Sequence, residues 1–302
     1  MTAPHGVVAS TLARLRNVAD AASVSFNEIL QAYAIERFLA RVAKLPDAET
    51  VLLKGAMMLR VWGVPRARPT MDVDLLKRGA ADQDSLIDLV RRCVAVADAA
   101  DAVEFDAASI VAESITEDAA YIGTRVRLLA RLANVRQAVQ IDFGVGDVVY
   151  PGPVRIDFPL LLGGEPVQLN AYPVEASIAE KFHAMVEHDL RNSRMKDFHD
   201  IWTLSKNCTF QHETLSKAIR ATFGKRETSL PTEVPPGLTA AYFDDTNHRA
   251  QWRAFCRRIE RTELAESLPQ IAAEIAAFIM PAVLATPEQS AGRSWPPGGG
   301  WS

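Results

Sequence analysis

Apolar and polar positions repeat with two different periods along the first half of the chain. Helical spacing of apolar residues predicts helices over 8–20, 26–44, 55–62 and 82–97, with Ser25 as a cap for the second. Alternation, or a short apolar run, predicts strands at 51–53, 72–76, 102–106, 109–116, 122–132, 136–143 and 154–158. A strand–helix–strand opening followed by consecutive strands favours an α+β fold with antiparallel neighbours over a doubly wound sheet.

The remainder of the chain has helical periodicity. After Gly163, Gly164 and Pro173, apolar spacing predicts helices at 174–188, 194–205, 212–223, 247–259 and 263–282. The segment 286–302 is rich in proline and glycine and is predicted to be disordered. We therefore expect three regions along the chain: a core over 1–170 that includes the N-terminal helices, a helical region over 171–285, and a disordered tail over 286–302.

Composition narrows the class of protein. The chain has 302 residues, 48% of them hydrophobic, which allows a sizeable core in one or two domains. Its net charge of −4 argues against a passive nucleic-acid binder. Its three cysteines lack metal-type spacing, its N-terminus lacks a signal-peptide pattern, and no run approaches ~20 apolar residues. These features predict a cytoplasmic protein without a membrane span.

Asp72 and Asp74 carry the most information about function. One apolar residue, Val73, separates them, so both carboxylates leave the same face of an extended strand. Adjacent anions repel each other, and folding alone gives little reason to place them there. A divalent cation such as Mg²⁺, which prefers carboxylate oxygens and substrate phosphates, would give a reason. The alternative is a solvated strand end or an Asx turn.

Two further features bear on the same chemistry: a helix start shortly before these acids in the sequence, and a third aspartate on a later strand. Lys54, Gly55 and Ala56 open an apolar helix, where the glycine would let backbone N–H groups approach a phosphate. An ordinary helix start is the alternative. Asp142 stands near the end of an alternating strand, where it either completes a set of three acids or prepares a turn.

Another group of charged residues lies in the helical region. Residues 174–188 have amphipathic spacing, and Lys181 falls at the edge of the buried face, where it either extends to water or needs an anion. Asp197 and Asp200 share one face of the next helix. Asp197 is a candidate to cap that helix, to pair with Lys181 or to polarise an attacking hydroxyl.

The remaining charged residues are less specific. Arg125, Arg127, Arg131 and Arg136 occur without an intervening acid and either bind phosphates or cover a solvated sheet face. His183 and His199 are interpreted as helix-surface or capping residues rather than ligands.

Together these motifs resemble the nucleotidyltransferase superfamily and, more narrowly, the AbiEii/AbiGii abortive-infection toxin family, the nucleotidyltransferase half of a toxin–antitoxin system. The resemblance spans about residues 50–205. The first family motif is matched by Lys54, Gly55, Ala56, Arg68, Thr70, Asp72 and Asp74, with Ala56 in place of the usual second glycine. The second is matched by Glu175, by Ile178-Ala179-Glu180-Lys181 and by Lys196-Asp197-Phe198-His199-Asp200.

The resemblance implies a nucleotidyltransferase-like mixed sheet flanked by helices, with the helical C-terminal region completing the active site. It implies a catalytic set of Asp72, Asp74, Asp142, Lys181 and Asp197. The nucleotide-binding set would be Lys54, Gly55, Ala56, Thr70 and Lys181, and the metal ligands Asp72, Asp74 and Asp142.

The expected reaction transfers a nucleoside monophosphate from an NTP to an acceptor hydroxyl, with two Mg²⁺ ions and release of pyrophosphate. Some members of the family add nucleotides to the 3′ end of tRNA, so the resemblance implies an RNA acceptor and a cognate antitoxin as partners. The alternatives are nucleotidylation of a protein or small molecule, a non-catalytic module that senses nucleotides or binds an antitoxin, and a helical scaffold. The presence of all three acids disfavours a degenerate site.

Overall fold

The chain divides into two compact units. The structure is a computed structural model that describes residues 5–65, 67–98, 101–118 and 121–302. Unit 1 contains the chain up to Val61 together with Thr70–Gly146 and Val154–Ala171. Unit 2 contains Trp62–Pro69, Asp147–Pro153 and Tyr172–Ser302. The main division thus follows Ala171, and two short segments from the first half of the sequence belong to the helical unit.

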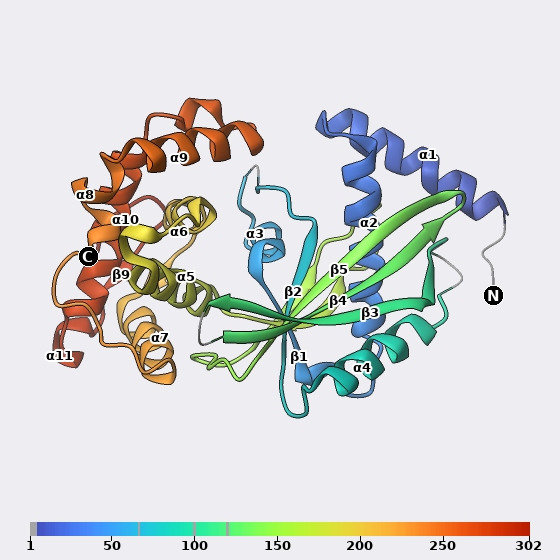
Figure 1. Ribbon diagram of the computed structural model, residues 1–302, viewed down its shortest axis with the longest axis horizontal. Coiled ribbons are helices and arrows are strands. Elements are labelled where there is room, and N and C mark those ends of the chain that lie inside the picture. Colours follow the sequence, from blue (N-terminus) through green and yellow to red (C-terminus); the bar gives the residue numbers. More distant parts are fainter. Residues whose placement is uncertain (1–4, 66, 99–100, 119–120) are drawn as a thin grey trace. The chain divides into compact units, whose positions relative to one another are not determined.

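Seven strands of unit 1 form one mixed sheet, in the order β3-β4-β5-β2-β1-β7-β6 (Figure 1). Their bounds are β1 Val51–Lys54, β2 Asp72–Lys77, β3 Glu104–Asp118, β4 Tyr121–Leu132, β5 Val135–Val145, β6 Val154–Phe158 and β7 Val167–Ala171. The pairs β2–β5 and β1–β7 are parallel, and the other neighbours are antiparallel. The predicted α+β fold with a mixed, nucleotidyltransferase-like sheet is confirmed.

Two strands differ from the prediction. β3 is one continuous strand where two were expected, because the irregularity between Asp106 and Val111 shifts its register against β4 without ending the pairing. β7 was not predicted. Its five residues follow the glycines at 163 and 164, which indicated a passage into the helical region, yet the strand pairs with both β1 and β6.

Four helices belong to unit 1: α1 His5–Ala22, α2 Phe26–Val42, α3 Met58–Val61 and α4 Gln83–Ala95. Ser25 caps α2 as predicted, since its Oγ accepts from the Glu28 amide at 3.2 Å and the Glu28 carboxylate accepts from the Ser25 amide at 3.0 Å. The helix expected at 55–62 begins as a 3₁₀ turn over Gly55–Met57 before continuing as α3.

One face of the sheet is apolar and lies under α2. Gln137 of β5 donates to Asn27 of α2 at 2.8 Å, so its side chain is on the face that α2 covers. Ile141, four residues further along the strand, shares that face and is completely buried. Asp142 therefore projects from the opposite face of the sheet. The alternation of β5 thus places Ile141 on the apolar face of the sheet and Asp142 on the other face.

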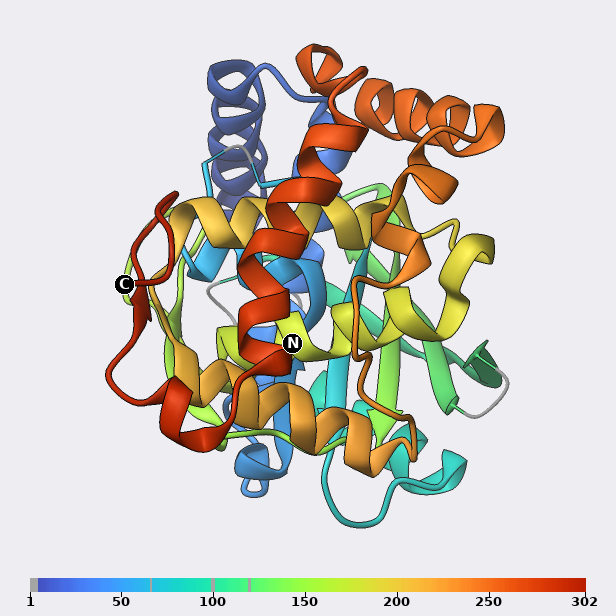
Figure 2. The ribbon, with the colours of Figure 1, turned by 90° about the vertical axis from the view of Figure 1, so that its left-hand side faces the viewer.

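Unit 2 is helical. Its α-helices are α5 Val174–His188, α6 Met195–Asn207, α7 His212–Lys225, α8 Ala240–Phe243, α9 Thr246–Arg258, α10 Leu268–Leu284 and α11 Pro287–Ser290. The long helix α10 lies across α6 and α7, and α5 packs between α6 and α7 (Figure 2). Phe182, Phe198, Phe223 and Phe278 are buried where these helices meet. No helix in the described ranges is long and apolar enough to cross a membrane.

The C-terminal tail is folded, which corrects the expectation of disorder over 286–302. It forms α11 and then β9 Ser294–Trp295, which pairs with β8 Phe210–Gln211. Trp295 is 6% exposed and donates from its indole nitrogen to the Ser205 carbonyl at 2.8 Å. Trp301 donates to the Phe278 carbonyl at 2.8 Å. Two aromatic anchors outweigh a composition that is otherwise typical of disordered chain.

Candidate functional site

A row of four charged residues crosses the middle of the sheet in unit 1. The strand register places Asp74 of β2 opposite Lys54 of β1 on one side and opposite Asp142 of β5 on the other. Asp142 in turn lies opposite Arg125 of β4. Residues directly opposite on neighbouring strands project from the same face of a sheet. Two carboxylates therefore lie side by side with a cation at each end of the row.

Asp72 shares the face of this row. It precedes Asp74 by two residues on β2 and pairs in register with Gln140 of β5. Both aspartates are half-buried. The Asp72 carboxylate accepts no hydrogen bond and makes no ion pair within the part of the chain that the structure describes. At Asp72, repulsion between these neighbouring carboxylates is opposed through the charge of Arg125 and not through a hydrogen bond or ion pair of its own within the described residues.

Asp142 is held by Arg125. Its two carboxylate oxygens accept from the guanidinium at 2.8 and 2.7 Å, and the residue is 8% exposed. The hydrogen bonds that Arg125 donates to Asp142, together with the charges of Asp142 and Asp72, raise the pKa of Arg125 further above its ordinary value, against the opposing effect of burial. In the sequence Arg125 was interpreted either as a phosphate ligand or as part of a solvated sheet face, and its spacing gave no sign of this pairing.

The donor set fits a divalent cation in its chemistry, because carboxylate oxygens on one sheet face are the ligands that Mg²⁺ prefers. Among the described residues, however, no three histidine, cysteine, aspartate or glutamate side chains are arranged closely enough to hold a metal ion. Asp72 and Asp74 project from the same face of β2. Asp142 would have to exchange Arg125 for the cation before it could act as a third ligand.

The glycine turn after β1 fits closely around the second aspartate. Gly55 has φ +72°, and a Cβ at this position would overlap the Asp74 carboxylate. Only glycine allows both the left-handed backbone and this close approach. Ala56 is 5% exposed and packs inward, so the departure from the family motif is accommodated as a core residue. Thr70 donates from its hydroxyl to the Asp72 carbonyl at 3.3 Å and stabilises the start of β2.

A second charged cluster is formed within unit 2. The Lys181 ammonium lies 3.1 Å from an Asp197 oxygen and 2.8 Å from an Asp200 oxygen. Arg68 donates to both oxygens of Asp200, at 2.8 and 2.9 Å. Arg194 donates to the other Asp197 oxygen at 2.7 Å. Both carboxylates are completely buried, and each is shared by two cations.

The ionised forms of this cluster stabilise one another. Burial alone would raise the pKa of Asp197 and Asp200, but Lys181 together with Arg194 or Arg68 lowers both below the ordinary value, that of Asp200 well below it. Burial would likewise lower the pKa of Lys181, but Asp200 and Asp197 raise it. All three groups are therefore charged at neutral pH.

The contacts in this cluster distinguish between the alternative roles that the sequence left open for Lys181 and Asp197. Lys181 is paired with anions and does not extend to water, and its predicted pairing with Asp197 is confirmed. Asp197 does not cap α6, because Arg194 occupies the N-cap position and no side chain caps the helix. Arg194 was not recognised in the sequence. Its position three residues before Asp197 was the available signal.

The two histidines are buried, so their interpretation as helix-surface or capping residues is wrong. His183 is 1% exposed, and its ring nitrogens meet Thr228 Oγ1 at 2.9 Å and the Arg226 guanidinium at 3.1 Å. Burial, with the charges of Arg226 and His188, lowers the pKa of His183 to about 4. His199 is also 1% exposed and lies 3.4 Å from Asp200.

The arginines along β4 and β5 are largely engaged with the sheet itself. Arg127 lies 2.8 Å from Glu113, and Arg131 lies 2.9 Å from Asp106, so both pair with acids of the neighbouring strand β3. Arg136 is exposed. These pairs favour a solvated sheet face over a prepared phosphate site.

The family model for the nucleotidyl transferase AbiEii toxin of type IV toxin–antitoxin systems matches residues 37–274, a range that includes both charged groups. The chain belongs to the AbiEii family. The expectation drawn from its two motifs is thereby confirmed.

Two crystal structures from Helicobacter pylori are similar to this AbiEii-family chain. One is JHP933, with 11% identity and a TM-score of 0.49, covering 85% of this chain and 94% of that one. The other is described provisionally as a nucleotidyltransferase, with 12% identity and a TM-score of 0.46, covering 85% and 98% of the two chains. No curated protein sequence matches this chain significantly.

Proposed function

We propose that this AbiEii-family protein is a metal-dependent nucleotidyltransferase that moves a nucleoside monophosphate from an NTP to an acceptor hydroxyl and releases pyrophosphate. The observation that carries the proposal is the row across the sheet. Asp72 and Asp74 project beside Asp142 from one face, with Lys54 and Arg125 at its ends. An arrangement of two cations at the margins and clustered acids between them suits a metal ion and a polyphosphate together.

In this proposal the chain's own residues bind and position. Asp72 and Asp74 would hold Mg²⁺, with Asp142 joining them if Arg125 releases it. The bound cation would neutralise triphosphate charge and favour loss of the acceptor proton. Lys54, Gly55, Ala56 and Thr70 would surround the phosphates, since they border the same strands. Catalysis of this kind depends mainly on positioning and on electrostatic stabilisation of the transferring group.

Lys181 and Asp197 remain predicted catalytic residues on the strength of the second family motif. The contacts in the cluster support one part of that prediction, the position and the charge of Lys181. The ion pairs to Asp197 and Asp200 fix the Lys181 ammonium in one place and keep it charged. A fixed ammonium is suited to counter a developing phosphate charge without reorganisation.

The acceptor and partners follow from the family. We propose an RNA acceptor, with the 3′ end of tRNA as the predicted target, and a cognate antitoxin that neutralises the protein. Nucleotidylation of a protein or small molecule is the competing reaction.

The test is incorporation of α-labelled NTP into total RNA by the purified chain in the presence of Mg²⁺, with pyrophosphate release measured in parallel. Asp72→Ala is expected to lower the rate at least ~100-fold, because it removes a cation ligand. Asp88→Ala, which removes an exposed carboxylate on α4, is the matched control and should retain activity.

Equal labelling by wild type and Asp72→Ala would overturn the assignment of the site. Label in protein or in a small molecule instead of RNA would retain the transferase but replace the acceptor. NTP binding without pyrophosphate release would favour the non-catalytic sensing module.

A further inference from the structure

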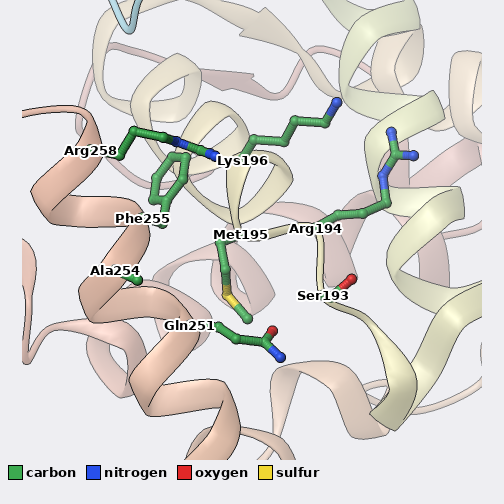
Figure 3. A pocket seen from close by; sticks show the side chains of 8 residues that line it. All are labelled: Ser193, Arg194, Met195, Lys196, Gln251, Ala254, Phe255 and Arg258. Carbon is green, nitrogen blue, oxygen red and sulfur yellow. The ribbon is translucent and has the colours of Figure 1, made fainter.

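A cavity of about 510 Å³ lies within unit 2, between the start of α6 and the second half of α9. The close view shows three cationic side chains, Arg194, Lys196 and Arg258, with their charged ends on one side of it (Figure 3). Its volume is in the range of ligand-binding pockets. No role for this α6–α9 pocket follows from the reaction described above.

Two of these cations have no hydrogen-bond or ion-pair partner in the part of the chain that the structure describes, although the charge of Lys196 contributes to the lowered pKa of its neighbour Asp197. Lys196 and Arg258 make no hydrogen bond or ion pair through their side chains with any residue in the described ranges. Arg258 is exposed and lies 5.5 Å from the Phe255 ring. Elsewhere on α9 the arginines at 249 and 253 are paired, with Asp244 and Glu266. The pocket therefore gathers two cations without an ion-pair partner among the described residues, whereas two other arginines of α9 are paired with acids.

The opposite part of the lining is apolar and neutral. Met195 and Phe255 are both 4% exposed and form a rigid wall. Gln251 and Ala254 are exposed at the rim. In Figure 3 the Met195 thioether and the Gln251 amide lie on the side away from the three cationic ends. Cations on one side and an apolar wall with an amide on the other match the two halves of a nucleotide, its phosphate and its sugar and base.

We propose that the α6–α9 pocket binds the phosphate backbone of a single-stranded RNA. The pocket is open to solvent, and its rim residues are exposed, which suits a strand that enters and leaves better than an enclosed mononucleotide. The inference deepens the proposed function and rests on it in one respect, since it assigns an RNA-binding surface to a protein proposed to act on RNA. Lys196 and Arg258 are the phosphate contacts, and Arg194 connects the pocket to Asp197.

The experiment measures fluorescence anisotropy of a fluorescein-labelled 12-nucleotide single-stranded RNA of mixed sequence with the full chain, in EDTA and without NTP. The Lys196→Gln, Arg258→Gln double variant should raise Kd at least about tenfold and reduce the salt dependence of log K by about 1.4, which corresponds to two phosphate contacts on a single strand. The control double variant Arg257→Gln, Lys225→Gln removes the same charge at exposed positions outside the pocket and should change Kd less than about twofold.

A second pair of variants tests the pocket without removing a cation. Ala254→Glu places an anion at the rim, whereas Ala250→Glu places it one turn earlier on α9, where the residue is also exposed but does not line the pocket. The first should weaken RNA binding several times more than the second. Circular dichroism of each variant verifies that the helices are retained.

Equal weakening by both double variants would show attraction by net charge alone and would overturn the proposal. Displacement of the RNA by unlabelled ATP, with ATP affinity lowered in the pocket variants and RNA affinity unchanged, would assign the pocket to a mononucleotide instead. The assay contains neither NTP nor metal ion, so failure of nucleotidyl transfer in Asp72→Ala experiments leaves its result unaffected.

Discussion

The two acidic groups of this molecule differ in how far their carboxylates are neutralised. In unit 2, Asp197 and Asp200 are completely buried, and each has two cations within 3.1 Å. In unit 1, Asp72 and Asp74 are half-buried neighbours on one strand, and the Asp72 carboxylate has no hydrogen-bond or ion-pair partner among the described residues. Every carboxylate of the first group is thus paired with two cations, whereas in the second group Asp72 is not paired with any described residue.

This difference predicts which property each group affects first, the stability of the fold or the activity. Buried charges that satisfy one another are costly to break, because removal of one partner leaves the others unpaired in a poorly solvated place. An acid that lies beside another acid and has no hydrogen bond or ion pair of its own lowers stability, and it persists where a ligand repays the cost. The cluster around Lys181 is therefore expected to matter first for folding, and the acids of β2 first for activity.

The largest expected effect is on the stability of unit 2. Asp200→Asn leaves Arg68 and Lys181 with one carboxylate fewer and should lower the free energy of unfolding by about 3 kcal/mol. All five tryptophans lie in unit 2, so urea unfolding followed by tryptophan fluorescence reports this unit. The control Asp244→Asn breaks an exposed pair with Arg249 in the same unit and should cost less than about 1 kcal/mol. If the two variants lowered the free energy of unfolding equally, the buried cluster would contribute no more to stability than an exposed ion pair, which would contradict the account.

The contribution of the buried cluster to stability depends on pH. The pKa of Asp200 is well below 3.8 in the folded protein, so its contribution is present above that value and is lost as the pH falls through the folded pKa. The pKa of Lys181 is raised above 10.5, so its contribution is lost only as the pH rises through that higher value. The stability difference between wild type and Asp200→Asn should therefore be constant from about pH 5 to 9 and shrink in strong acid. A difference that disappeared near neutral pH would contradict these charge states.

A smaller effect is expected at the helix cap of unit 1. Ser25→Ala removes the capping box of α2 and should destabilise that helix by about 1 kcal/mol. Hydrogen exchange of the α2 amides measures the change, with Ser10→Ala at an exposed position of α1 as the control. Nucleotidyl transfer should be retained, because the row on the sheet is untouched. Loss of transfer in Ser25→Ala would mean that stability of unit 1, rather than its acids, limits activity.

The smallest expected effect concerns the availability of Asp142. Arg125→Gln removes the cation that holds both Asp142 oxygens, so a divalent cation would no longer compete with it. The Mg²⁺ concentration for half-maximal transfer should fall by up to about fivefold, since a partly exposed pair contributes at most about 1 kcal/mol. Arg127→Gln, two residues along the same strand, is the control. A higher Mg²⁺ requirement in Arg125→Gln would show that Arg125 supports the site.

Much of the fold could be predicted because periodicity reports local burial. The capped helix after Ser25 and the helix over 174–188 were predicted closely. β7 and the folded tail were not, because each is stabilised by distant partners: β7 by β1 and β6, and the tail by Trp295 against Phe278 at 4.9 Å. Contacts between residues far apart in the sequence leave no periodic trace.

Prediction of the site from the sequence was limited in the same way. The spacing of Asp72 and Asp74 predicts that they share a strand face, which follows from strand geometry alone. Their alignment with Asp142 depends on the parallel pairing of β2 with β5, which residue spacing does not encode. The partners Arg125 and Arg194 were likewise missed, since an arginine finds its carboxylate through the fold. The family motifs supplied what local patterns could not.

The central claim is that the acids of β2 are retained for a bound cation and not for folding. Its most direct test is the free energy of unfolding of wild type and Asp72→Asn, each measured by thermal circular dichroism with and without Mg²⁺. Without the ion, Asp72→Asn should be at least as stable as wild type, because it relieves repulsion. With Mg²⁺ at about five times its Kd, wild type alone should gain about 1 kcal/mol. A variant that is less stable without Mg²⁺, or that gains as much from it as wild type, would contradict the account.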